Sequence, residues 1–183
     1  MGILNGTSEL FYLKVIKMNY GKIKPVDVAN GEGVRVSLFV SGCPHHCKGC
    51  FNAELWNYDA GEKITADTLK ELLAACKPSY IAGLSLLGGE PLDPKNLIGV
   101  QYIASVFKRC FPNKTVWCYT GYRWENISHL PIMKYIDVLV DGQFVEGLKD
   151  PRLKFRGSSN QRIIMVKPSL ESGKIYVRKD LME

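Results

Sequence analysis

Three cysteines in the first third of the chain have a spacing that can bind a metal cluster. Cys43, Cys47 and Cys50 form the pattern C-x3-C-x2-C in a loop that also contains Gly42 and Gly49. Thiolates are soft ligands, and glycines allow the backbone to turn tightly around a metal centre. A four-iron, four-sulfur cluster normally takes four thiolates, so three would leave one iron open to a substrate. An open position is typical of catalytic rather than structural sites.

Two other interpretations of this loop stay open on spacing alone. Zinc could take the three cysteines together with His45 or His46. A thioredoxin-type redox pair could form between Cys47 and Cys50, although that leaves Cys43 without a role. We expect His45 and His46 to lie on a solvated face of the loop rather than to carry protons.

A second special loop, Gly88-Gly89-Glu90-Pro91, follows a nearly continuous apolar segment at 81–87. Taken alone it would be a plain turn. The cysteine loop follows the preceding apolar segment, 34–40, in the same way. Two unusual loops at the ends of successive strands point to a single site.

The elements that position these loops alternate between strand and helix. Helical patterns are found at 65–76, with Thr65 as N-cap, and at 96–109 and 124–130. Strand patterns are found at 34–40, 81–87, 115–119, 136–140, 161–166 and, more weakly, 174–178. This alternation predicts an α/β fold with five to six mostly parallel strands, whose carboxyl ends carry the site. A closed barrel needs about 250 residues, so a partial, open β/α barrel or twisted sheet is expected.

Length and composition agree with one globular domain. The chain has 183 residues, of which 46% are apolar and 23% charged. No apolar segment approaches the roughly 20 residues that span a bilayer, and the N-terminus does not resemble a signal peptide. We therefore expect a cytoplasmic protein whose six cysteines are thiols or metal ligands rather than disulfides.

The chain is basic, and the excess charge is uneven. The formal net charge is +6, and from Arg152 onward eight basic residues face three acidic ones. This end of the chain should favour acidic partners. Nucleic acid is not favoured, because no aromatic residues are interleaved with the bases in a stacking pattern.

The two loops together resemble those of radical S-adenosylmethionine enzymes, and finer details resemble the anaerobic ribonucleoside-triphosphate reductase activating proteins. Those details cover roughly residues 18–161 and include the following segments: Pro25-Val26-Asp27-Val28, Asn30-Gly31-Glu32-Gly33, Leu38 to Cys43, Trp117 with Tyr119-Thr120-Gly121-Tyr122, Val140-Asp141-Gly142, and Arg156 to Gln161. Residues 1–17 have no counterpart and are expected to be an extension of unknown role before a single radical S-adenosylmethionine domain at 18–183.

The resemblance implies a [4Fe-4S] cluster with three ligands, Cys43, Cys47 and Cys50, and S-adenosylmethionine bound to the open iron. It implies cofactor contacts from Gly49, Cys50, Phe51, Gly88, Gly89 and Glu90. The glycines would admit the methionine moiety, Glu90 would help to bind its ammonium, and Phe51 would lie near the adenosyl portion. Two positions depart from the pattern. Glu90 stands where the family usually has Asp, and Gly49 replaces an aromatic residue that other radical enzymes place before the third cysteine.

The implied activity is reductive cleavage of S-adenosylmethionine to a 5′-deoxyadenosyl radical, which would form a glycyl radical on the large subunit of the reductase. The implied partners are that subunit and a flavodoxin-type electron donor. Alternatives are an activase of another glycyl-radical enzyme, of the pyruvate formate-lyase type, and a zinc-binding module that docks on nucleic acid.

Overall fold

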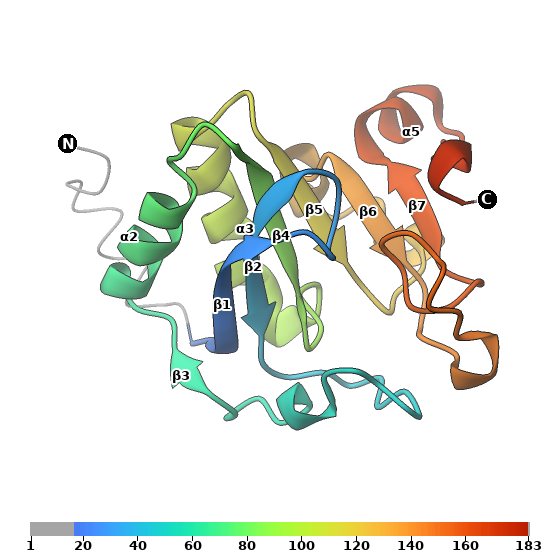
Figure 1. The fold of residues 1–183 in the computed structure, drawn as a ribbon, viewed down its shortest axis with the longest axis horizontal. Helices are drawn as coiled ribbons and strands as arrows, with labels where there is room; N and C mark the ends of the chain where they lie inside the picture. The colour runs from blue at the N-terminus through green and yellow to red at the C-terminus, as the bar shows by residue number, and fades with distance from the viewer. Residues whose placement is uncertain (1–16, 183) are drawn as a thin grey trace.

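A seven-stranded mixed sheet forms the centre of the structure, a computed structural model that describes residues 17–182 (Figure 1). Its strand order is β3-β1-β2-β4-β5-β6-β7. Four adjacent strands are parallel to one another: β2 (Val34–Val40), β4 (Ile81–Gly88), β5 (Thr115–Tyr119) and β6 (Val138–Asp141). The strands outside them pair antiparallel: β1 (Asn19–Asp27), β3 (Glu62–Lys63) and β7 (Arg162–Met165).

The α/β class and the parallel centre are confirmed, whereas the predicted count of five to six strands is wrong. The sequence pattern missed β1 and β3, because β1 carries Lys22, Lys24 and Pro25 and lacks an apolar alternation. The predicted strand at 174–178 is also wrong, since only an isolated bridge joins Val177 to Ile164. The predicted extension falls almost entirely on residues 1–16, which lie outside the described residues.

The predicted helices are present with small changes at their ends. Thr65 caps α2 (Ala66–Ala75) through a reciprocal capping box with Thr68. Asp93 caps α3 (Pro94–Cys110) by accepting a hydrogen bond from the Lys95 amide. The remaining helical segments are α4 (Trp124–Ile127), α5 (Val166–Ser172) and the 3-10 turns η1 (Ala53–Leu55), η2 (Pro131–Tyr135), η3 (Glu146–Leu148) and η4 (Lys179–Leu181).

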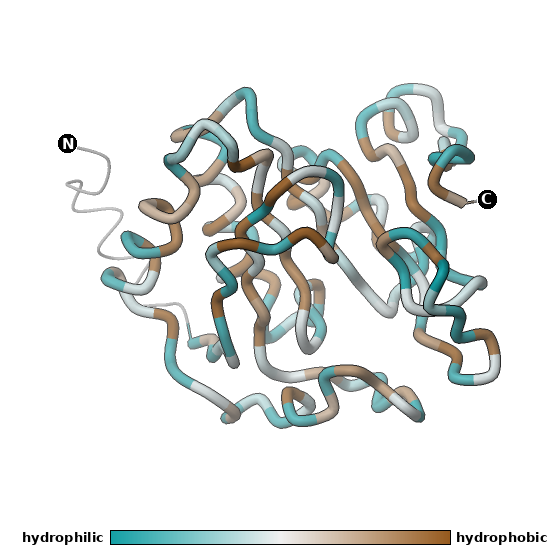
Figure 2. The backbone as a smooth tube through the Cα atoms, viewed as in Figure 1, coloured by the Kyte–Doolittle hydropathy of each residue, from teal (hydrophilic) through white to brown (hydrophobic). Residues whose placement is uncertain are grey.

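The sheet has one face covered by helices, which we call the helix face, and one that we call the open face. Helices α2 and α3 pack on the helix face around buried strand residues such as Val36, Leu38 and Leu86 (Figure 1). Figure 2 shows the hydrophobic residues concentrated along the central strands. Successive side chains of a strand alternate between faces, so Arg35 and Phe39 of β2 point to the open face. Within residues 17–182 no helix is long and apolar enough to cross a membrane.

Candidate functional site

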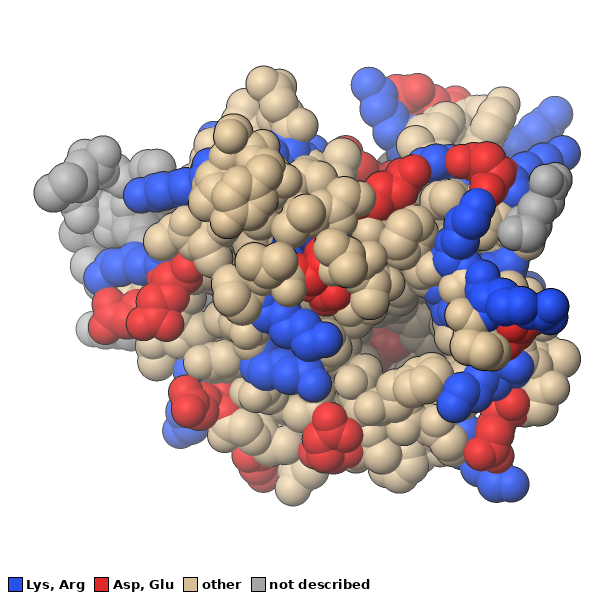
Figure 3. All heavy atoms as spheres, viewed as in Figure 1, with Lys and Arg blue, Asp and Glu red and all other residues tan. Residues whose placement is uncertain are grey.

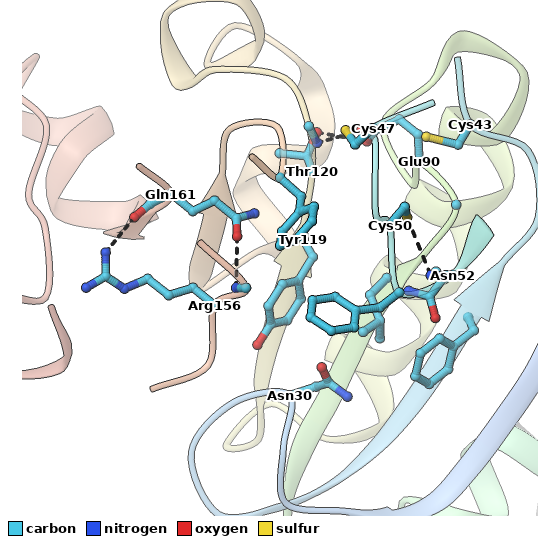
Figure 4. Close-up of a pocket in the computed structure, with 18 of the residues that line it drawn as sticks. Asn30, Cys43, Cys47, Cys50, Asn52, Glu90, Tyr119, Thr120, Arg156 and Gln161 are labelled. Atoms are coloured by element: carbon cyan, nitrogen blue, oxygen red, sulfur yellow. Dashed lines mark hydrogen bonds between the residues drawn. The ribbon is translucent and has the colours of Figure 1, made fainter. Parts of the chain in front are cut away.

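The carboxyl ends of β2, β4 and β5 surround a cavity of about 750 Å³ (Figure 4). The loop that follows each strand contributes to its wall. The lining residues from these loops are Cys43, His45, Cys47, Cys50, Phe51, Gly88, Gly89, Glu90, Thr120 and Gly121. The structure thus brings together the two loops that the sequence singled out, at the edge where parallel strands are expected to place a ligand.

The three cysteines of the first loop are free thiols that line this one cavity. Burial raises the pKa of Cys43 to about 11 and also raises the pKa of Cys47. Gly42 and Gly49 have positive φ angles of 91° and 70°, as a tight turn around a centre requires. In the chain without metal, burial therefore holds Cys43 and Cys47 as neutral thiols at neutral pH.

The three thiols fit the donor set of a multi-iron cluster. Among residues 17–182, no three His, Cys, Asp or Glu side chains are close enough together to hold one metal ion. A cluster presents a separate iron to each thiolate, so its ligands do not have to meet at one point. Three soft donors on one cavity wall, with space beside them, meet that requirement.

The Gly-Gly loop is glycine-rich because two backbones meet there. Gly88 has φ of 109°, and a Cβ on Gly89 would lie 2.4 Å from the carbonyl oxygen of Gly42. The Gly89 amide donates to the Val40 carbonyl at 2.7 Å, and the Glu90 amide donates to the Gly42 carbonyl at 2.8 Å. These glycines hold the loop after β4 directly against the cysteine loop.

Glu90 is buried at 1% exposure, and both of its carboxylate oxygens accept hydrogen bonds from the protein. Oε1 accepts from the Leu92 amide at 2.9 Å and from Thr120 Oγ1 at 2.8 Å. Oε2 accepts from the Gly121 amide at 2.7 Å and lies 2.8 Å from His45 Nε2. One side chain therefore joins the loops that follow β2, β4 and β5.

The expectation for His45 is wrong, and the expectation of a solvated position holds for His46. The His45 side chain is only 9% exposed, because it packs between Glu90 and Gln143 and against the edge of the Tyr122 ring. Sequence reasoning missed this contact because its two partners are 45 and 98 positions away. His46 is exposed and stacks on Trp56, with ring centroids 4.7 Å apart.

Phe51 lines the cavity, whereas Gly49, in the same loop, is not one of its lining residues. Phe51 is 60% exposed, packs on Phe144 and has the Lys149 ammonium 4.7 Å above its ring. Gly49 faces Glu146 of η3. An exposed aromatic ring beside a large cavity is suited to contact a flat ligand or a partner protein.

Sequence reasoning missed three lysines of the cavity wall, Lys22, Lys24 and Lys149. The first two lie over the Phe39 ring at 4.7 and 5.4 Å. In the part of the chain that the structure describes, no carboxylate lies within ion-pair distance of any of the three. Figure 3 shows basic side chains on both sides of the hollow.

The basic C-terminal stretch is more internally paired than its composition suggests. Ion pairs join Arg152 to Asp150, Arg178 to Glu32, and Arg162 to Asp141. Asp141 also accepts a hydrogen bond from the Trp124 amide at 2.7 Å. These contacts fix the end of the chain and the turn after β5 against the sheet.

Comparisons with known proteins agree with the cysteine loop. Residues 29–164 match the family model of a 4Fe-4S single cluster domain. Proteins named anaerobic ribonucleoside-triphosphate reductase-activating protein are similar over most of both chains. The one from Enterobacteria phage T4 is 46% identical over 80% of this chain and 93% of its own. Those from Vibrio cholerae and Escherichia coli K12 are 43% and 40% identical over 80% and 79% of this chain and 97% and 96% of their own.

Among solved structures, QueE from Escherichia coli aligns with a TM-score of 0.39 at 13% identity, over 63% of this chain and 58% of that one.

Proposed function

The chain belongs to the family of anaerobic ribonucleoside-triphosphate reductase-activating proteins and carries its 4Fe-4S single cluster domain, and we propose that it activates the reductase by forming a glycyl radical on the large subunit. With a [4Fe-4S] cluster and S-adenosylmethionine bound, the site would supply one-electron reductive cleavage of the S–C5′ bond, which would give methionine and a 5′-deoxyadenosyl radical able to take a hydrogen atom from a glycine Cα of that subunit. The protein itself would bind and orient the cluster and S-adenosylmethionine and would shield the radical from water.

One observation carries this proposal: three free thiols and the Gly-Gly-Glu loop line a single cavity at the carboxyl ends of parallel strands. Cys43, Cys47 and Cys50 would each hold one iron. The cavity volume of about 750 Å³ lies within the range of small-molecule sites. Of the cofactor contacts that the resemblance implies, we expect Gly49, Cys50, Phe51, Gly88 and Gly89 to touch the cofactor directly, whereas buried Glu90 supports the loops that carry them.

Several further features belong to the same proposal. Residues 18–183 would form one radical S-adenosylmethionine domain, in which the sheet is a partial β/α barrel and the open face is its interior. The cytoplasm is the proposed compartment, since cysteines persist as free thiols in a reducing environment and all six cysteines are free. A protein substrate would complete the wall of the cavity.

We expect the electron donor to be an acidic protein of the flavodoxin type. Lys22, Lys24 and Lys149 place positive charge at the cavity, and among residues 17–182 no carboxylate lies within ion-pair distance of them. Such charges steer an acidic partner toward the site. Their ammonium groups sit on aromatic rings, which favours cations at these positions.

The proposal is tested by anaerobic reconstitution with iron and sulfide, followed by reduction with S-adenosylmethionine and the large reductase subunit. We expect about four iron per chain and a glycyl-radical doublet in the electron paramagnetic resonance spectrum. Cys47→Ala should abolish both signals, whereas Cys76→Ala, at a buried core thiol on the helix face, should keep them. A colourless chain with one zinc would overturn the proposal in favour of the zinc module.

The choice of donor is a second arm of the same assay. Lys22→Glu/Lys24→Glu should slow radical formation about tenfold with an acidic protein donor at low salt and leave it unchanged with dithionite. Lys134→Glu is the matched control, because its ammonium also lies over an aromatic ring, that of Tyr135, but away from the cavity. Equal rates for all three proteins with the acidic donor would contradict the assigned docking side.

A further inference from the structure

We infer that Glu90 is a positioning residue, held by His45, and not the group that binds the ammonium of the cofactor. The inference concerns how the proposed site is held together, and part of it can be tested whether or not the proposed function is correct. It rests on the hydrogen bonds of one buried carboxylate.

The acceptor capacity of Glu90 is used up by the protein. An ionised carboxylate has about four lone-pair positions on its two oxygens. Two donors, the Leu92 amide and Thr120 Oγ1, occupy Oε1 at 2.9 and 2.8 Å. The Gly121 amide and His45 Nε2 occupy Oε2 at 2.7 and 2.8 Å. A ligand ammonium would have to displace one of these donors, so its charge must be met by other acceptors.

The His45 contact has a defined direction. The side-chain amide nitrogen of Gln143, Nε2, lies 3.0 Å from His45 Nδ1. An amide nitrogen can only donate a hydrogen bond, so Nδ1 accepts it. In the neutral ring Nε2 then carries the proton and donates to Glu90. Gln143 thereby fixes the tautomer that lets His45 hold the carboxylate.

This arrangement gives His45 a role in the cysteine loop. His45 lies between Cys43 and Cys47, and its ring is anchored to Glu90 on the loop after β4. Backbone bonds already join the start of the cysteine loop to the same loop, through the Glu90 amide and the Gly42 carbonyl at 2.8 Å. Asn96 of α3 adds a side-chain bond of 2.9 Å to each of the Ser41 and Glu90 carbonyls. His45 extends this anchoring to the middle of the loop, next to Cys47.

The first test uses the full chain without a cluster and measures alkylation of Cys47 and Cys50 by iodoacetamide, resolved by mass spectrometry. His45→Phe removes the donor, and Glu90→Gln places an amide NH₂ against groups that themselves donate. Each change should speed alkylation at least about fivefold, as expected when one charge-assisted hydrogen bond is lost. The double variant should be no faster than the faster single variant, because both changes release the same contact.

Matched controls separate loop release from unfolding. His46→Phe changes the neighbouring histidine, keeps an aromatic ring against Trp56 and should leave the alkylation rate unchanged. Cys118 is fully buried on the helix face and should stay unreactive in every variant. His45→Gln retains a donor and should lie closer to the wild type than His45→Phe.

The second test uses the reconstituted protein with an oxidised cluster and measures S-adenosylmethionine affinity. His45→Phe and Glu90→Gln should weaken binding by similar factors that do not multiply in the double variant. Wild-type alkylation in Glu90→Gln, combined with a loss of affinity that His45→Phe does not share, would show that Glu90 binds the ammonium and overturn the inference. If the wild-type protein bound no S-adenosylmethionine, the proposed function would fail while the alkylation result still decided the role of His45.

Discussion

The two faces of the sheet are built from alternate residues of the same strands, yet they differ in kind. On the helix face, Val36, Leu38 and Val40 of β2 join a continuous apolar core with α2 and α3. On the open face, the alternate residues of β2 are Arg35, Ser37 and Phe39. Arg35 and Ser37 are fully buried all the same. One face holds the fold together, whereas the other buries polar groups beside a cavity, and buried polar groups are retained only where partners or function require them.

The largest expected effect compares two leucines of the sheet on opposite faces. Leu38→Ala removes a fully buried side chain from the helix face and should lower the free energy of unfolding by about 3 to 4 kcal/mol. Leu87→Ala lies on the open face, where the side chain lines the cavity, and should lower it by only about 2 kcal/mol, because fewer packed neighbours are lost. Urea unfolding of both variants measures the difference. Equal losses would mean that the open face is packed as densely as the helix face.

A smaller effect is expected at the buried guanidinium of the open face. Arg35 donates to Ser85 Oγ, to Thr115 Oγ1 and to three backbone carbonyls, those of Glu32, Leu84 and Thr115, at 2.7 to 3.2 Å. Burial lowers its pKa to about 10, so it remains charged at neutral pH. Arg35→Lys offers three donors to five acceptors and should lower the free energy of unfolding by about 2 kcal/mol.

The control for this change is an exposed arginine. Arg152 is paired with Asp150 but 88% exposed, so Arg152→Lys should leave the urea midpoint where it is. If Arg35→Lys were equally silent, the hydrogen bonds of the buried guanidinium would add nothing to stability, and the polar character of the open face would have no structural role.

The sequence allowed the helix face to be predicted better than the open face. Apolar periodicity identified β2, β4 and β5, and the Thr65 cap located the start of α2, because these signals are local. Strand β1 was missed, because a strand that contains Lys22, Lys24 and Pro25 carries no apolar alternation. Its two lysines line the cavity, so the missed strand also hid part of the site.

The residue types of the candidate site could be predicted from the sequence, but the hydrogen bonds between them could not. The spacing of Cys43, Cys47 and Cys50 was enough to single out the cysteine loop, and its meeting with the Gly-Gly-Glu loop followed from the parallel strands. The four donors around Glu90 come from three loops, and their convergence depends on tertiary contacts that no local pattern encodes. For the same reason, the prediction of a solvated His45 was wrong.

The smallest expected effect has the opposite sign to the others. Tyr119 ends β5, lines the cavity, and its buried hydroxyl has no hydrogen-bond partner among residues 17–182 (Figure 4). Burial raises its pKa, so the hydroxyl remains a donor at any physiological pH. An unpaired buried hydroxyl destabilises the fold, and Tyr119→Phe should therefore raise the free energy of unfolding by about 1 kcal/mol. Tyr20→Phe, where the hydroxyl donates to the Glu62 carboxylate at 3.2 Å, should instead lower it slightly in the same urea experiment. A loss of stability in Tyr119→Phe would mean that the hydroxyl is already satisfied in the folded chain. A gain would mean that the open face keeps an unpaired donor beside the cavity, whereas the helix face is built from packed apolar side chains.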